Sequence, residues 1–242
     1  MTDSASPDDS RRNAAQSITM IRHVAQSLGP EMVRLIAFLG GASLPLLLTD
    51  PAVQDVRSTR DVDVIIEVMT YGEYASLAEE LRRRNFQEDM SPGAPICRWV
   101  VDETIVDVMP TDEKILGFSN RWYKPALRTA QDYSLSGDDG TTIRLVTPSY
   151  FLATKLEAYF HRGEGDLYAS HDIEDIITLI DGRPELLDEI RHEAPEDVRE
   201  FIAHFFQDLL RDPGFREAVE GHLPYDARNR LGIVLARIRQ IA

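Results

Sequence analysis

The hydrophobic pattern of the chain changes once, and that change restricts the fold class. Up to Val146, short apolar runs and alternating segments typical of β-strands are mixed with amphipathic, helix-like stretches. From Thr147-Pro148, an N-cap and first-turn pair, apolar residues recur at helical spacing nearly to the end. We therefore expect an α+β protein with a C-terminal helical region. The predicted parts are an N-terminal helix and polar tail over 1–30, a core over 31–146, and helices over 147–242.

Strand-like segments lie in the first 146 residues. The run at 35–39 is continuously apolar and ends in Gly40-Gly41, which indicates a buried strand closed by a tight turn. The segment 61–67 has valine or isoleucine at every second position, and two further runs flank Asp102-Glu103 as in a hairpin. The predicted strands are 35–39, 61–67, 96–101, 104–109 and 141–146.

Helical segments are marked by apolar spacing and by capping residues. Gly29-Pro30 closes the first helix, Thr70 and Glu73 form a capping box at the start of another, and Gly182 is placed to cap a third. The predicted helices are 11–28, 43–48, 70–84, 148–162, 171–181, 184–192, 196–211 and 226–241.

The chain is acidic, with 26 Lys and Arg residues against 41 Asp and Glu residues and a formal net charge of −15. Residues 1–130 contain 14 basic and 19 acidic residues, so the excess of negative charge is mainly C-terminal. Nucleic acid is repelled at long range, and binding it requires a local basic patch. The segment 120–128 mixes aromatic and basic residues, and both acceptor binding and plain packing stay open for it. Arg82-Arg83-Arg84 complements a helix C-terminus.

The sequence favours the cytoplasm. The single cysteine, Cys97, excludes an intramolecular disulfide and is expected in the core. The first ten residues hold three aspartates and no apolar run, unlike a secretory signal. The longest low-charge stretch, 35–48, has only 14 residues and contains glycine and proline, so we expect no transmembrane helix and no membrane partner.

Three aspartates suggest a metal site. Asp61 and Asp63 begin a strand, and the period of two places both carboxylates on one face. An isolated pair of this kind is more often a solvated strand face. Asp107, however, is a lone acid in the middle of an apolar strand, where a carboxylate is costly unless it is paired or metal-bound. If the two strands are neighbours, the three carboxylates suit Mg²⁺ or Mn²⁺ in a two-metal site.

Two further features suit phosphate. Gly40-Gly41 and Ser43 stand at a strand-to-helix junction, where missing Cβ atoms let the backbone approach an anion, although a simple turn explains the glycines alone. Lys155 is one of only three lysines beside 23 arginines, and it lies near the apolar face of a predicted helix. An ammonium there suits a phosphate, or its stem runs along the helix edge.

These motifs together resemble the nucleotidyltransferase superfamily of the DNA-polymerase-β type, and within it the abortive-infection AbiEii-type family of toxin–antitoxin systems. The resemblance covers roughly residues 35 to 181. Its motifs are Leu39-Gly40-Gly41-Ala42-Ser43, Arg57-Ser58-Thr59-Arg60-Asp61-Val62-Asp63, the strand with Asp107, then Lys155, Arg162 and His171-Asp172-Ile173-Glu174-Asp175.

The resemblance implies a fold and a set of site residues. The fold would be a polymerase-β-like mixed sheet with flanking helices, followed by helices. The implied metal ligands are Asp61, Asp63 and Asp107. The implied nucleotide-binding residues are Gly40, Gly41, Ser43, Arg57, Thr59, Lys155, Asp172 and Asp175, and Lys155 would contact the phosphates.

The expected activity is Mg²⁺-dependent (or Mn²⁺-dependent) transfer of a nucleoside monophosphate from an NTP to an acceptor hydroxyl, with release of pyrophosphate. The acceptor would be RNA or tRNA, as in the toxin-type relatives, and a cognate antitoxin would be a partner. Two alternatives stay open: a small hydroxylated acceptor, as in antibiotic nucleotidyltransferases, and a non-catalytic nucleotide-binding regulatory protein. The acidity of the chain favours the small acceptor weakly.

Overall fold

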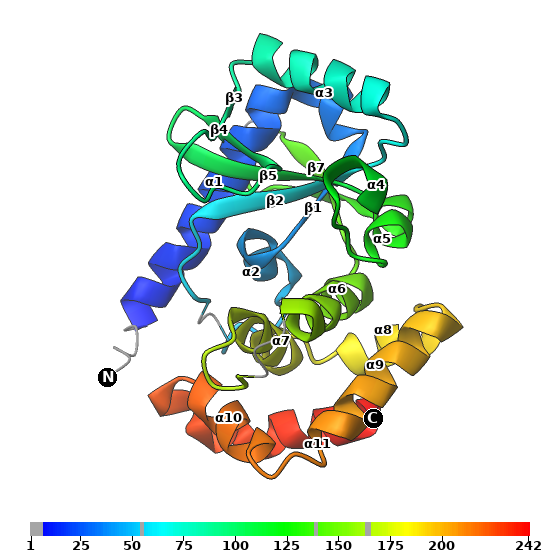
Figure 1. Ribbon diagram of the computed structural model, residues 1–242. Coiled ribbons are helices and arrows are strands. Elements are labelled where there is room, and N and C mark those ends of the chain that lie inside the picture. Colours follow the sequence, from blue (N-terminus) through cyan, green and yellow to red (C-terminus); the bar gives the residue numbers. More distant parts are fainter. Residues whose placement is uncertain (1–6, 54–55, 138–139, 163–165) are drawn as a thin grey trace. The chain divides into compact units, whose positions relative to one another are not determined.

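The computed structural model forms two compact units (Figure 1). We call the first the sheet unit, which contains residues 15–43 and 58–147. The second, the helical unit, contains the described parts of 1–14, 44–57 and 148–242. The residues that the structure describes are 7–53, 56–137, 140–162 and 166–242.

The predicted α+β class, with a mixed sheet and a C-terminal helical region, is confirmed. The division into parts 1–30, 31–146 and 147–242 stays a prediction, and the first six residues of the polar tail lie outside the described residues. Along the described stretches of the chain, no helix combines the length and the apolar character needed to cross a membrane.

The sheet unit is built on a seven-stranded sheet in the order β3-β4-β5-β2-β1-β7-β6. β2 pairs in parallel with β5 and antiparallel with β1, so it lies inside the sheet. β4 and β5 form the predicted hairpin, and β1 pairs in parallel with β7. The strands are β1 (Ile36–Leu39), β2 (Asp61–Ile66), β3 (Gln87–Glu88), β4 (Arg98–Val101), β5 (Thr104–Pro110), β6 (Gln131–Ser134) and β7 (Thr142–Leu145).

The helices predicted at 11–28 and 70–84 are present in the structure, the first of them reaching with its residues up to Ala14 into the helical unit, whereas the short helices at 113–116 and 123–129 were not predicted. The long first helix has a non-helical residue, Gly29, at φ 72° and ψ 163°, where Gly29-Pro30 was expected to close it. The capping box of Thr70 and Glu73 is present, and the helix it starts lies along one face of the sheet (Figure 1). The elements are α1 (Pro7–Val33), the 3₁₀ turn η1 (Gly41–Ser43), α3 (Tyr71–Arg83), α4 (Glu113–Leu116) and α5 (Tyr123–Thr129).

The helical unit packs its helices around α6 and α7. Side chains from α6, α7, α9 and α11, among them Phe151, Ile180, Phe206 and Val234, are fully buried and form its core. The elements are α2 (Leu44–Leu47), α6 (Pro148–Arg162), α7 (His171–Gly182), α8 (Leu186–His192), α9 (Glu196–Leu209), α10 (Phe215–His222), η2 (Tyr225–Arg230) and α11 (Leu231–Ile241).

Several elements were not predicted, and one glycine has a different role. Strand β6 is mostly exposed, so it lacks the apolar alternation that marks a strand. Helix α10 has only eight residues, and η2 occupies the start of the helix predicted from 226. Gly182 is the last residue of α7 rather than its cap. A Cβ atom there would lie 2.7 Å from Leu48 Cδ2, so the glycine permits close packing.

Candidate active site

The sheet brings the three predicted aspartates to one face. Strands β2 and β5 pair in parallel with Asp63 opposite Asp107, and registered partners point to the same side of a sheet. Asp61 lies two residues before Asp63 and shares that side. The expectation that the two strands are neighbours is confirmed. The Asp107 side chain is only 11% exposed, whereas the Asp61 side chain is 33% exposed.

Gly40 is in direct contact with one of these carboxylates. Its φ is +75°, and a Cβ atom built there would lie 1.8 Å from Asp63 Oδ2. The residue that precedes it, Leu39, is the register partner of Asp63 on the neighbouring strand. Glycine is therefore required here for two reasons: the left-handed backbone and the space that the Asp63 carboxylate occupies.

Arg98, on β4, holds two of the three aspartates. It is the antiparallel register partner of Asp107. Its Nε donates to Asp107 Oδ1 at 2.8 Å and its Nη2 to Asp107 Oδ2 at 2.8 Å, while Nη2 also donates to Asp61 Oδ2 at 3.2 Å. Hydrogen bonding to Asp107 raises the pKa of Arg98 in spite of its partial burial. The guanidinium is thus a fixed positive charge on the aspartate face.

Two hydroxyl groups near the aspartates are buried. Thr59 Oγ1 donates to Asp61 Oδ1 at 3.0 Å and so orients that carboxylate. Ser43 is fully buried, and its hydroxyl donates to the backbone oxygen of Leu39 at 2.8 Å. Ser43 therefore closes the turn after β1, and its role toward triphosphate, like that of Gly41, stays a prediction.

The aspartate face offers oxygen atoms of the kind that a divalent cation prefers as ligands. Within the described residues, no group of three or more His, Cys, Asp or Glu side chains is arranged to hold a metal ion. At Asp61 and Asp107, the guanidinium of Arg98 supplies the positive charge instead. The chemistry of the donor set still suits Mg²⁺ or Mn²⁺, because carboxylates are the hard oxygen ligands that these ions prefer, and the ligand role of the three aspartates stays a prediction.

The helical unit contains the other predicted residues in one buried cluster. Lys155 Nζ lies 2.6 Å from Asp175 Oδ2 and 3.1 Å from Asp172 Oδ1. Arg57 Nε donates to Asp175 Oδ1 at 2.8 Å and its Nη2 to Oδ2 at 3.1 Å. Burial would lower the pKa of Lys155, but Asp175 and Asp172 outweigh it and raise that pKa. Two cations and two carboxylates therefore compensate each other, and their predicted nucleotide contacts stay predictions.

The basic segment 120–128 is paired and packed. Lys124 Nζ and Arg128 Nη2 both contact Glu67 Oε1, at 3.0 and 3.4 Å. Trp122 is 6% exposed, with the Arg121 guanidinium 5.0 Å from its ring centroid. These contacts favour the packing interpretation over a surface that stacks nucleic-acid bases.

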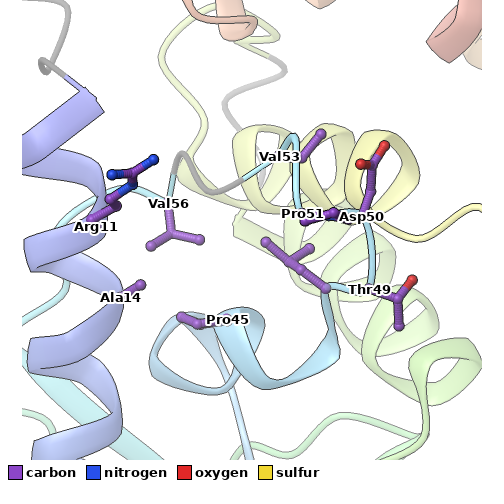
Figure 2. A pocket seen from close by; sticks show the side chains of 9 residues that line it. Arg11, Ala14, Pro45, Thr49, Asp50, Pro51, Val53 and Val56 are labelled. Carbon is purple, nitrogen blue, oxygen red and sulfur yellow. The ribbon is translucent and has the colours of Figure 1, made fainter.

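A separate pocket of about 260 Å³ lies within the helical unit (Figure 2). Pro45 of α2, Arg11 and Ala14 of α1, and the loop that begins at Thr49 line it. None of the predicted site residues lines this pocket.

Comparisons with known proteins include a similarity to a solved structure. No protein-family model matches the sequence, and no curated protein matches it. The solution structure of the antibiotic-resistance factor ANT(2'')-Ia, which describes substrate-regulated conformation dynamics, is similar to this chain at 13% identity and a TM-score of 0.44. The match covers 81% of this chain and 94% of that chain. A similarity of this size assigns no activity.

Arg98 is the site residue that the sequence patterns did not single out, yet a signal for it exists. The predicted hairpin turns at Asp102-Glu103, and with a two-residue turn Val101 faces Thr104. Counting back along both strands places Arg98 opposite Asp107. The register of a short hairpin can therefore identify a cross-strand partner of a predicted site residue.

Proposed function

We propose that the chain is a divalent-metal-dependent nucleotidyltransferase, which moves a nucleoside monophosphate from an NTP to an acceptor hydroxyl. One observation carries this proposal: Asp61, Asp63 and Asp107 share one face of two paired strands, and Gly40 lies directly against Asp63. Carboxylates that share a face repel each other unless positive charge compensates them. Arg98 supplies one positive charge to Asp61 and Asp107, and a metal–nucleotide complex is a substrate that would supply more.

Asp61, Asp63 and Asp107 would hold the metal. When bound, Mg²⁺ polarises phosphoryl oxygens and lowers the pKa of an attacking oxygen. Thr59 would keep Asp61 oriented through its hydrogen bond, and Gly40 would leave the space that Asp63 needs. A ligand fixed by a neighbouring residue loses less freedom when the metal binds.

The proposed reaction is one displacement at the α-phosphorus of the NTP. The acceptor oxygen forms a bond to that phosphorus, the bond to the bridging oxygen breaks, and pyrophosphate leaves with the electron pair. Asp107 would accept the proton of the acceptor hydroxyl. Each of its two oxygens accepts one hydrogen bond from Arg98, so a second lone pair on each oxygen is available for that proton.

The nucleotide contacts belong to the same proposal. In the sheet unit, Gly40 and Gly41 would approach the triphosphate through the backbone. The contact of Lys155 with phosphate stays a prediction from the family resemblance, and its partners within the helical unit are Asp172 and Asp175.

For the acceptor we propose a small hydroxylated molecule. The chain carries a net charge of −15, and the basic residues Lys124 and Arg128 already pair with Glu67. Both features disfavour a polyanionic acceptor. An RNA or tRNA acceptor and a cognate antitoxin as partner are supported by the family resemblance alone. The third alternative is a protein that binds nucleotides without catalysing transfer.

Label transfer tests these alternatives. The purified chain is incubated with each α-³²P-labelled NTP and Mg²⁺, with pooled small hydroxylated metabolites and aminoglycosides in one arm and total RNA in the other. We expect label in the small-molecule arm and none after Asp61→Asn or Asp63→Asn. Asp102→Asn is the matched control, because Asp102 is an exposed turn aspartate at φ 50°, which Asn tolerates. Undiminished transfer by the Asp61 and Asp63 variants would refute the mechanism, and label in RNA would reverse the acceptor.

A further inference from the structure

Arg98 donates hydrogen bonds to both carboxylate oxygens of Asp107. It also donates to one oxygen of Asp61, and Thr59 donates to the other. Asp107 Oδ1 and Oδ2 both accept from its guanidinium, in a fork with two bonds of 2.8 Å. Asp61 Oδ2 accepts from Arg98 and Asp61 Oδ1 accepts from Thr59. All four carboxylate oxygens thus have hydrogen-bond partners within the protein.

Strand β4 fixes the guanidinium in this position. The neighbours of Arg98 on either side, Cys97 and Trp99, are 3% and 1% exposed, so they anchor the strand on its opposite face. The Arg98 side chain itself is 22% exposed. A forked arginine–carboxylate pair on an anchored strand has a defined geometry, unlike a mobile surface ion pair.

The guanidinium and a divalent cation compete for the same oxygens. Arginine stays charged at every pH at which proteins fold, so it cannot yield its place by losing a proton. A divalent cation bound to Asp61 and Asp107 would share oxygens that now accept from Arg98, and the two positive charges would repel each other at contact distance. Metal binding therefore weakens the contacts of Arg98 with the aspartates, and these contacts in turn weaken metal binding.

We propose that Arg98 is an internal counter-ion of the metal site. It stabilises the metal-free protein by compensating Asp61 and Asp107, and it withdraws from Asp61 when a divalent cation binds. The protein then keeps its aspartates in place without metal, at the cost of weaker metal binding. This inference rests on the proposed function, since it takes the three aspartates as the metal ligands.

The test is a Mn²⁺ titration of the full chain, with free Mn²⁺ followed by electron paramagnetic resonance and thermal unfolding measured on the same samples. Arg98→Gln should lower the melting temperature without metal, tighten Mn²⁺ binding about tenfold, and increase the stabilisation by Mn²⁺. Arg98→Lys keeps the charge but loses the fork, so it should give an intermediate affinity. Arg98→Lys also tests the proposal if the Arg98→Gln variant does not fold.

Arg82→Gln is the matched control for the loss of one positive charge. Arg82 belongs to the same unit, pairs with Glu88 and lies over the Trp99 ring. Its Mn²⁺ affinity should stay within about twofold of the wild type. Asp61→Asn should abolish binding in every background.

Each outcome decides between the two proposals. If the wild type binds Mn²⁺ through Asp61 but Arg98→Gln binds it equally or more weakly, Arg98 is a positioning or purely structural residue, and the counter-ion inference fails while the metal site stands. If no variant binds Mn²⁺ and no label is transferred, the proposed function fails, and the inference fails with it. If Arg82→Gln tightens Mn²⁺ binding as much as Arg98→Gln does, the effect comes from the change in net charge alone, and the inference is overturned.

Discussion

Gly40→Ala tests the contact between the glycine turn and the aspartate face. The added methyl group would meet Asp63 Oδ2 at 1.8 Å and Asp63 Cγ at 2.6 Å, and the backbone φ is +75°. The left-handed backbone costs an L-residue about 1–2 kcal/mol. Displacing the carboxylate and its surroundings adds about 1–3 kcal/mol, the usual cost of inserting a methyl group into packed structure. We expect a total loss of about 2–5 kcal/mol in the free energy of unfolding.

The two contributions can be separated by a second glycine of the sheet unit. Gly117, the C-cap of α4, has φ +81°, and a Cβ atom there would meet nothing within 4 Å. Gly117→Ala should therefore lose only the backbone contribution of about 1–2 kcal/mol. The double variant Gly40→Ala/Asp63→Ala should recover part of the difference, because the two most crowded atoms are removed.

Urea unfolding followed by tryptophan fluorescence is the assay. The chain has two tryptophans, Trp99 and Trp122, and both belong to the sheet unit, so the signal reports that unit. Gly40→Ala should also lose Mn²⁺ binding, because Asp63 is displaced. Equal losses of stability for Gly40→Ala and Gly117→Ala, with no coupling to Asp63→Ala, would refute the contact.

Three further predictions concern other parts of the chain. Burial raises the pKa of Cys97 from 9.0 to about 12, so a thiol reagent at pH 8 should react about a thousandfold more slowly with the folded protein than with the urea-unfolded protein; equal rates would contradict this. Burial would also raise the pKa of Asp175, but Lys155 and Arg57 outweigh it and hold the pKa below its ordinary value of 3.8. The stabilisation by Asp175 is therefore present above pH 3.8 and is lost as the pH falls through the lower folded-state pKa. Urea unfolding at pH 7 and at pH 2.5 should show that Asp175→Asn loses less unfolding free energy between these two pH values than the wild type does. Thr70→Ala removes the capping box of α3 and should lower the free energy of unfolding by about 1 kcal/mol, and an unchanged urea midpoint would show that the cap adds nothing.

Much of the fold could be predicted because its signals are local. The alternation from Asp61, the turn at Asp102-Glu103 and the capping box at Thr70 each depend on a few neighbouring residues, and each is present in the structure. The pairing of β2 with β5 is different. It joins residues far apart in the sequence, so no local pattern shows that Asp63 faces Asp107.

The interactions of the candidate site were harder to predict than its residues. Lys155 was expected near phosphate because of its rarity, yet it lies between Asp172 and Asp175. Residue type alone cannot distinguish a lysine that binds a ligand from one that compensates buried carboxylates. Arg98 is the converse case, since one arginine among 23 attracts no notice until its strand register is known.

The order of the chain in the helical unit has a consequence for biosynthesis. Leu44, Leu46 and Leu47 of α2 are buried, and within that unit α2 packs against α7, which begins only at His171. More than 100 residues separate the two helices, so at ribosomal rates of about 5–20 residues per second α2 waits roughly 6–25 s for its packing partner. During that interval three leucines that are buried in the finished protein lack this cover. A fragment ending at Thr147 would keep them in that state permanently, so it should require a chaperone or aggregate even though it carries every strand of the sheet.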